Sequence, residues 1–391
     1  MQDAAAIIAC KSAIDCCIFA RMSGLALQRH LESDPALAAA YEKIRTYAGG
    51  IVISGYDLTK RCNLRCEGCF FFEGELSVIY PEAKTDAEYD AFFADEVRRG
   101  VNYPHFAGAE PALVQQRLRT AARHWRRGLV YTNGTVRIDP EIRFMIHVSL
   151  WGNPDTDALL RGAPVFRKAV QNYRGDRRAV VMMTLNRRNV AEIPDVVRAC
   201  ADAGMRISFN HYSPSRQYKR RVEAGDDHHD DMSFRFSTRD DNLMLRADDL
   251  ARVRDLIGRA LDDAPETVVY SRFYNEWINA APPRFAIDAA TGMATDCPIL
   301  NMPRHRQYHV DFSFSDDECC IANIDCSGCR HYVAGYTKIM AERRSYLDSI
   351  ERFRGWVEVF DTWSRLHFPD WDDLPVPADA SENPSPLGAH A

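Results

Sequence analysis

Three closely spaced cysteines are the residues of this chain best suited to metal chemistry. Cys62, Cys66 and Cys69 form a C-x3-C-x2-C motif just after a short apolar run, Ile51–Ile53. Three thiolates on one loop can hold three irons of a [4Fe–4S] cluster and leave the fourth iron without a protein ligand. An open metal position indicates a catalytic site, because a purely structural site fills its coordination shell.

The alternative for this loop is a zinc site or a group of buried thiols. Zinc sites favour paired C-x2-C units with a fourth ligand nearby, a pattern that the residues around Cys62 lack. The spacing resembles the cluster motif of the radical S-adenosylmethionine (SAM) superfamily. In that superfamily SAM takes the open iron, and an electron from the cluster cleaves SAM to methionine and a 5'-deoxyadenosyl radical. Gly68 stands where an aromatic residue is usual, so the packing against adenine is assigned to Phe70 or Phe71.

Later segments resemble the elements that contact SAM in this superfamily. The sequence 108–111 reads Gly-Ala-Glu-Pro, which is similar to the Gly-Gly-Glu-Pro motif. The resemblance implies that Gly108 and the adjacent backbone bind the SAM amino group, with Glu110 as a carboxylate contact. It implies further SAM contacts for three polar residues at or after later strands: Asn133, Ser149 and Asn186. Ordinary turn formation explains Asn133 and Ser149 equally well.

A second group of cysteines lies far along the chain. Cys326 and Cys329 have C-x2-C spacing, Cys297 precedes them, and either Cys319 or Cys320 can complete four ligands. We favour Cys320. Four thiolates suit zinc or a fully ligated [4Fe–4S] cluster. Beside a radical-SAM-like motif, this group resembles the auxiliary-cluster domains called twitch or SPASM, and it has enough cysteines for one auxiliary cluster.

The elements that must position these residues follow an alternating pattern. From Gly50 onward, short apolar strands alternate with helical stretches, which is typical of βα units and a parallel sheet. Expected strands are 51–54, 129–131, 147–150, 180–185 and 207–210, and expected helices are 85–99, 190–204, 247–260 and 336–360. The cysteine loop then follows a strand, where β/α barrels collect their active sites. Cys200 is expected in the core.

We therefore predict an α/β fold, a partial parallel (β/α)6 barrel of the radical SAM type. The expected division is an N-terminal helical segment at 1–48, the barrel at 49–275, an auxiliary iron–sulfur domain at 276–345, and a C-terminal helix and tail at 346–391. Residues 210–214 are interpreted as a loop on the substrate side. The acidic run 226–231, with two histidines, is interpreted as a surface loop or lid rather than a metal site.

Composition narrows the class of protein. The 391 residues are 46% hydrophobic with a net charge of −6, which argues against a nucleic-acid binder. No apolar run approaches the roughly 20 residues of a membrane span. Twelve cysteines without a secretory signal favour metal ligands in a reducing compartment, so we expect a cytoplasmic protein without membrane contact.

The function expected from these features is hydrogen-atom abstraction by a radical SAM enzyme. The cofactors are SAM, the SAM-binding [4Fe–4S] cluster and a second, auxiliary [4Fe–4S] cluster, and a reductase, flavodoxin or ferredoxin is the expected electron donor. The absence of an evident leader-binding domain favours a small-molecule substrate, such as a sugar, nucleoside or amino-acid derivative. The alternatives are a maturase of a ribosomally made peptide, or a non-catalytic protein that binds zinc or iron–sulfur clusters. No side chain is assigned a catalytic role.

Overall fold

The fold is built on a largely parallel sheet. The computed structural model describes residues 24–72, 82, 84–229, 233–302, 304–315, 319 and 323–377. Within them, eight strands form one sheet in the order β6-β5-β4-β3-β2-β1-β7-β8. The strands are β1 (Ile53–Asp57), β2 (Tyr103–Ala107), β3 (Leu129–Thr132), β4 (Met145–Leu150), β5 (Ala179–Leu185), β6 (Arg206–His211), β7 (Gln307–Tyr308) and β8 (Phe314–Ser315).

The first six strands pair in chain order, and every one of these pairs is parallel. Strand β5 is Val- and Met-rich and almost entirely buried, as expected for a strand covered on both faces. Parallel neighbours need crossover connections, and helices provide them here. This arrangement confirms the predicted partial (β/α)6 barrel.

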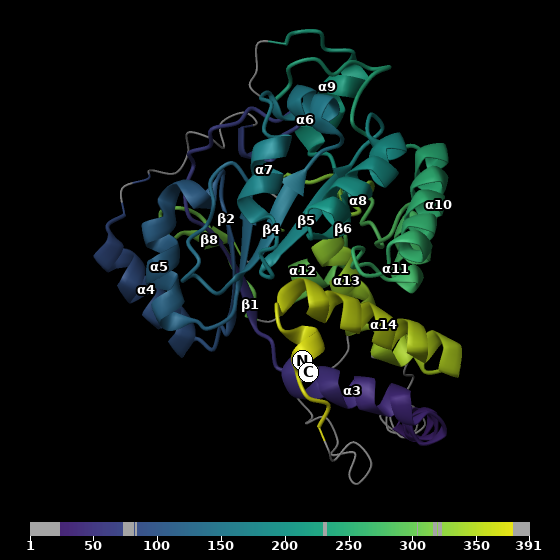
Figure 1. The fold of residues 1–391 in the computed structure, drawn as a ribbon. Coiled ribbons are helices and arrows are strands. Elements are labelled where there is room, and N and C mark those ends of the chain that lie inside the picture. Colours follow the sequence, from purple (N-terminus) through teal and green to yellow (C-terminus); the bar gives the residue numbers. More distant parts are fainter. Residues whose placement is uncertain are drawn as a thin grey trace.

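Helices cover the outside of the sheet (Figure 1). Local signals explain where they begin: α4 has a capping box between Thr85 and Glu88, and α6 has Asn153 as its N-cap followed by Pro154. The helices are α3 (Pro35–Tyr47), α4 (Asp86–Arg98), α5 (Gln115–His124), α6 (Pro154–Arg161), α7 (Phe166–Tyr173), α8 (Ile193–Asp202), α9 (Arg216–Ala224), α10 (Ala247–Asp263), α11 (Arg272–Asn279), α12 (Pro298–Asn301), α13 (Tyr332–Ala341) and α14 (Ile350–His367).

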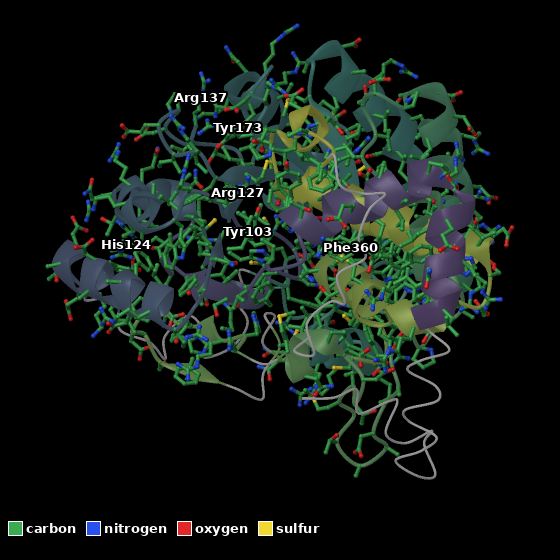
Figure 2. The ribbon with its side chains drawn as sticks, turned by 90° about the horizontal axis from the view of Figure 1, so that it is seen from below. Tyr103, His124, Arg127, Arg137, Tyr173 and Phe360 are labelled. Atoms are coloured by element: carbon green, nitrogen blue, oxygen red, sulfur yellow. The ribbon has the colours of Figure 1, made fainter. Side chains whose placement is uncertain are left out.

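Helices from the two ends of the described chain pack together and close the lower end of the barrel. Helix α3 lies along α14 (Figure 1), and Asp34 at its start pairs with Arg354 at 2.9 Å. The end of α14 reaches the start of β2, where the Tyr103 hydroxyl donates to the His367 carbonyl; Figure 2 labels Tyr103 in the view from below. His147 of β4 also contacts the Leu366 carbonyl at 2.9 Å. These contacts seal the barrel at the ends where its strands begin.

The C-terminal segment departs from the expected single helix. Residues 336–360 form parts of two helices, because α13 ends at Ala341 and Ser349 caps a new helix at Ile350. Strand β7 pairs in parallel with β1, so the segment expected to form the auxiliary domain extends the barrel sheet. The expected strand 51–54 is displaced toward 53–57, and the expected helix 190–204 begins as a short 3-10 turn at 190–192.

Candidate active site

The three cysteines of the first motif line one pocket at the end of β1. Cys62, Cys66 and Cys69 are half-buried thiols on the wall of a cavity of about 300 Å³. Their loop is held in place from outside, because the Glu67 amide donates to the Leu160 carbonyl at 2.8 Å and the Gly68 amide donates to the Ser233 carbonyl at 2.6 Å. The predicted position on a loop after a strand end is therefore found.

The separation of the sulfurs fits a cluster better than a single ion. Tetrahedral zinc, with Zn–S bonds of about 2.3 Å, brings its thiolates within roughly 4 Å of one another. Among the described residues, the three side chains that bring ligand atoms within 4.8 Å of one another are Asp226, Asp227 and His228, and no trio of cysteines does so. A group larger than one ion is needed to bridge the three thiols, and a [4Fe–4S] cluster is such a group.

A buried arginine lies beside these thiols. Arg161, at the end of α6, is 1% exposed and lines the pocket. Its guanidinium donates to the Ser149 carbonyl at 2.8 Å, donates to the Asn133 carbonyl, and lies 3.4 Å from the Asp157 carboxylate. Burial raises the pKa of the Cys66 thiol to about 11, and the Arg161 cation opposes this rise. A fixed positive charge thus favours the thiolate form that metal binding requires.

Asn133 contacts the cysteine loop itself. Its Nδ2 donates to the Cys62 sulfur at 3.6 Å and to Asn63 Oδ1 at 2.9 Å, while its Oδ1 accepts from the Thr135 backbone amide at 2.9 Å. An N–H group directed at a ligand sulfur stabilises negative charge there. Asn133 therefore lies in the site as predicted, but its side chain is directed at a metal ligand rather than at open space.

Glu110 is more enclosed than a ligand contact would require. The carboxylate is 1% exposed and accepts hydrogen bonds from the Ala112 amide, the Thr132 hydroxyl and the Asn133 amide at 2.9, 2.7 and 2.6 Å. Burial raises its pKa, and these donors oppose the rise. The described contacts give Glu110 a structural role that joins the loops after β2 and β3, and its predicted contact with SAM stays a prediction.

Position 108 requires a glycine, because its backbone has a positive φ and lies very close to the chain that follows β1. Its φ is +106°, and a Cβ there would meet the Thr59 carbonyl oxygen at 2.6 Å. The Ala109 amide donates to the same oxygen at 2.8 Å. The close approach expected for a ligand is thus made to the chain at the end of β1, although Gly108 also lines the pocket.

Of the other residues predicted to contact SAM, some line the pocket and one does not. Phe70, Phe71 and Ser149 line the pocket. Asn186 is buried but is not among the lining residues; its Oδ1 accepts from the Arg188 amide at 3.0 Å within its own turn. The SAM contact predicted for Asn186 stays a prediction. Its polar side chain is needed to satisfy the backbone where β5 ends.

Tyr212 occupies the space beside the third cysteine that the unusual Gly68 leaves free. A Cβ on Gly68 would lie 2.0 Å from the Tyr212 hydroxyl oxygen, and that hydroxyl donates to the Gly68 carbonyl at 3.2 Å. Tyr212 and its neighbours Asn210, His211 and Ser213 line the pocket, so the expected substrate-side loop lies there. An aromatic ring is thus present near Cys69, supplied by the chain after β6.

Sequence reasoning missed Arg161 and Glu67. Asp157 and Arg161 have the i, i+4 spacing of an ordinary surface ion pair, so nothing in the sequence marked them as buried. Glu67 is 0% exposed and accepts from the Arg235 and Ser237 backbone amides at 2.7 and 3.1 Å. The only sequence signal for Glu67 was its position between Cys66 and Cys69 in the cysteine motif.

The second cysteine group is closed. Cys297, Cys326 and Cys329 are at most 6% exposed, and backbone amides of Ile299 and Leu300 donate to the Cys297 sulfur. The loop of Cys326 and Cys329 is bound to the chain after β6, since the Arg330 amide donates to the Ser213 hydroxyl at 2.9 Å. This group lies against the pocket, because residues adjacent to its cysteines, Ile299 and His331, line it.

The fourth ligand of this group is either Cys319 or Cys320. Cys320 lies outside the described residues, so its assignment stays a prediction. Cys319 is half-buried and lies near the other three sulfurs. Burial raises the pKa of the Cys297, Cys326 and Cys329 thiols most, and a negative charge on Cys319 raises it further. The described part of the chain therefore brings four thiols together with Cys319 as the fourth.

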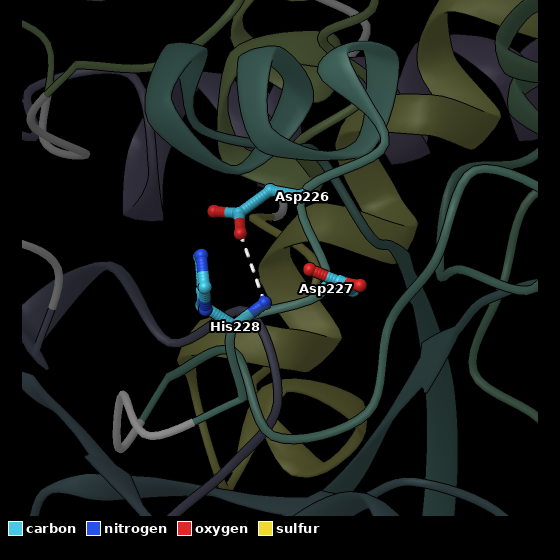
Figure 3. Close-up of side chains that lie close together, drawn as sticks. All are labelled: Asp226, Asp227 and His228. Atoms are coloured by element: carbon cyan, nitrogen blue, oxygen red, sulfur yellow. Dashed lines mark hydrogen bonds between the residues drawn. The ribbon is translucent and has the colours of Figure 1, made fainter.

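The acidic loop after α9 offers a weaker cluster (Figure 3). Asp226 accepts from the His228 amide at 2.9 Å and from Arg221 Nε at 2.6 Å, while Asp227 and His228 are exposed. Exposed acidic groups commonly gather without an ion, and Asp226 already has a cationic partner. The described part of this run matches the expected surface loop.

Comparisons with known proteins agree with this picture. No protein-family model matches the chain. The sporulation killing factor maturation protein SkfB of Bacillus subtilis is 27% identical over 162 residues, which is 38% of this chain and 39% of that protein. The resemblance to the radical SAM superfamily is thereby confirmed. The matched region spans well under half of the relative's length.

Solved structures with a similar arrangement share little sequence with this chain. Streptococcus suis SuiB bound to S-adenosylmethionine has 13% identity and a TM-score of 0.48 over 68% of this chain and 60% of that one. SuiB bound to its precursor peptide SuiA has 11% identity and a TM-score of 0.47 over 72% and 66%. The hydrogenase maturase HydG of Carboxydothermus hydrogenoformans has 11% identity and a TM-score of 0.42 over 87% and 83%.

The sequence match agrees with the predictions of an enzyme, of SAM and of iron–sulfur clusters that the motifs give. The described residues include no helix long and apolar enough to cross a membrane.

Proposed function

We propose that this protein is a radical SAM enzyme that modifies a ribosomally made peptide. The observation that carries the peptide assignment is the sequence match to a maturation protein of a killing factor. This match supports the alternative reading of the sequence better than the small-molecule reading. The expectation of a sugar, nucleoside or amino-acid derivative rested on the absence of an evident leader-binding domain, which is weaker support.

The residues of the first motif fit the SAM-binding cluster. Cys62, Cys66 and Cys69 would hold three irons, with Arg161 and Asn133 placing positive charge and an N–H donor beside the thiolates. When bound, the cluster and SAM supply a 5'-deoxyadenosyl radical, which removes a hydrogen atom from the substrate. Excluding water from the pocket would protect this radical.

The second cysteine group would hold the auxiliary cluster, with Cys297, Cys319, Cys326 and Cys329 as ligands. Ile299 and His331, close in sequence to two of these cysteines, line the same pocket as the first motif. An electron acceptor at this place could take an electron from a substrate radical and give a net oxidation. A reductase, flavodoxin or ferredoxin would supply the electron that starts the reaction.

The test uses the full chain with its clusters reconstituted under anaerobic conditions. The protein is incubated with SAM, a reductant and short peptides encoded next to its gene, and in parallel with a sugar, a nucleoside and an amino-acid derivative. A SAM-dependent change in the mass of a peptide supports the proposal. Conversion of a small molecule with all peptides unchanged would return the assignment to the small-molecule reading.

Iron and acid-labile sulfide counting separates these enzymes from a non-catalytic zinc protein. Two [4Fe–4S] clusters require roughly eight irons per chain, and a zinc protein contains none. A chain that bound zinc tightly, bound no iron and released no 5'-deoxyadenosine would exclude the proposed function.

A further inference from the structure

The pocket has a second end, opposite the cysteine loop, where three histidines come together. His105 lies on β2, His305 precedes β7, and His331 precedes α13, and all three line the pocket. Burial lowers the pKa of His105 most, and the nearby rings of His367, His305, His147 and His331 add smaller effects. Three segments that are distant in the sequence thus contribute imidazole rings to one region.

The depth of this region follows from the strand register. His105 pairs with Gly55 in the middle of β1, and His305 Nδ1 lies 3.4 Å from the carbonyl oxygen of Ile53, the first residue of β1. The cysteine loop follows the last residue of β1. Since a strand rises about 3.3 Å per residue, His105 and His305 lie on the order of 10 Å below the cysteines. We call this region, His105, His305 and His331, the histidine floor.

The histidine floor has unused hydrogen-bonding capacity. One buried ring nitrogen of each residue, Nε2 of His105, Nε2 of His305 and Nδ1 of His331, has no hydrogen-bond partner among the described residues. The other nitrogen of His105 faces the Tyr131 hydroxyl at 3.3 Å. Buried polar atoms are normally paired, so unpaired ones on a cavity wall indicate that a ligand group satisfies them.

The floor contains no permanently charged side chain. Burial lowers the pKa of His105 and of His305, so both of these rings are neutral at pH 7. Of the described residues that line the pocket, the side chains outside the histidine, cysteine and tyrosine classes that can carry a full charge are Glu110 and Arg161. Both lie near the Cys62 thiol at the opposite end, where Glu110 raises the pKa of the thiol and Arg161 lowers it. A carboxylate, phosphate or ammonium group on the floor would lack a counter-ion, which is costly in a buried site.

We propose that the histidine floor binds an uncharged hydrogen-bonding group of the substrate, such as an amide, a hydroxyl or an aromatic N–H. A neutral imidazole both donates and accepts, so these rings can satisfy either kind of group. This inference rests on the proposed function in that it describes the substrate of the same pocket. For a peptide substrate, it means that the residue inserted into the barrel is polar and uncharged, such as Asn, Gln, Ser, Thr, Tyr or Trp.

The test measures binding, not turnover, so that its failure is distinct from failure of the proposed function. Benzamide, benzoate and benzylamine are titrated by calorimetry into the cluster-reconstituted protein containing SAM. Benzamide is expected to bind at least about tenfold more tightly than either charged analogue. His105→Phe and His305→Phe should each weaken benzamide binding by about tenfold, the effect of one lost buried hydrogen bond.

The controls keep the result interpretable. His228→Phe, on the exposed loop after α9, should leave benzamide binding unchanged. Circular dichroism and iron content show whether each variant folds, and His305→Phe, at a half-buried position, replaces His105→Phe if the latter does not. Benzoate or benzylamine binding as tightly as benzamide would overturn the inference. Undetectable binding of benzamide, or binding unaffected by the histidine variants that fold, would overturn it as well.

Discussion

The two cysteine groups of this protein differ in how far they are open. The first group comes from eight consecutive residues, 62–69, and its thiols are half-buried on the wall of a pocket. The second is gathered from residues 297–329, and its Cys297, Cys326 and Cys329 thiols are buried. A short loop with three ligands leaves one side of a cluster exposed, while four ligands from separate segments enclose it. A reactive metal site keeps one coordination position free of protein ligands, whereas a structural site fills all of them.

The largest expected effect separates the roles of the two groups. Cys66→Ala should abolish 5'-deoxyadenosine formation and remove roughly four irons per chain, because the open cluster loses a ligand. Cys329→Ala should remove a similar amount of iron, leave SAM cleavage in place and stop product formation. Chromatography of 5'-deoxyadenosine and iron counting measure both. Cys200→Ala, which removes a buried thiol from α8, is the control. Persistent SAM cleavage by Cys66→Ala would contradict the assignment of the first group.

A second comparison tests which neighbouring cysteine closes the second group. Cys319→Ala should lose roughly four irons per chain, whereas Cys320→Ala should retain a full complement, because Cys319 is the described thiol near Cys297, Cys326 and Cys329. Iron and sulfide counts on the two variants, purified in parallel, decide between them. The opposite pattern would restore the expectation made from the sequence.

A smaller effect concerns what holds the open loop in place. Glu67→Gln should reduce the free energy of unfolding by about 1–3 kcal/mol, because the buried carboxylate accepts from the Arg235 and Ser237 amides and a glutamine cannot accept with both atoms. Urea unfolding followed by circular dichroism measures the change. Glu223→Gln, at an exposed position of α9, should change it little. Equal unfolding curves for the two variants would show that residues 235–237 do not support the loop through Glu67.

The smallest effect concerns the reduction potential of the open cluster. Asn133→Ala removes the N–H donor to the Cys62 sulfur and should lower the potential by about 40 mV, the equivalent of about 1 kcal/mol for one electron. Redox titration followed by electron paramagnetic resonance measures the shift. Asn172→Ala, whose side chain donates to the Gly134 carbonyl instead, is the control. An unchanged potential in Asn133→Ala would mean that this bond does not act on the cluster.

Much of the fold could be predicted because its signals are local. The strand and helix patterns placed β1, β3 to β6 and helices α4, α8 and α10 to within a few residues, since periodicity and capping act over short stretches. The expected helix 336–360 was wrong because α13 ends at Ala341 and Ser349 caps a new helix, a break that the apolar periodicity alone did not reveal. The SAM contact predicted for Asn186 stays a prediction, because a polar residue after a strand serves its own turn as readily as a ligand.

The sequence by itself determined the open thiolate loop, the barrel and the existence of a second cysteine group. Each of these depends on spacing within short segments. Only the tertiary structure decided that Arg161 lies buried beside Cys66, that Cys319 lies near the other thiols of the second group, and that three distant histidines line one pocket. The physical reason is that charge, burial and hydrogen-bond satisfaction are set by neighbours in space, and those neighbours are supplied by segments up to hundreds of residues away.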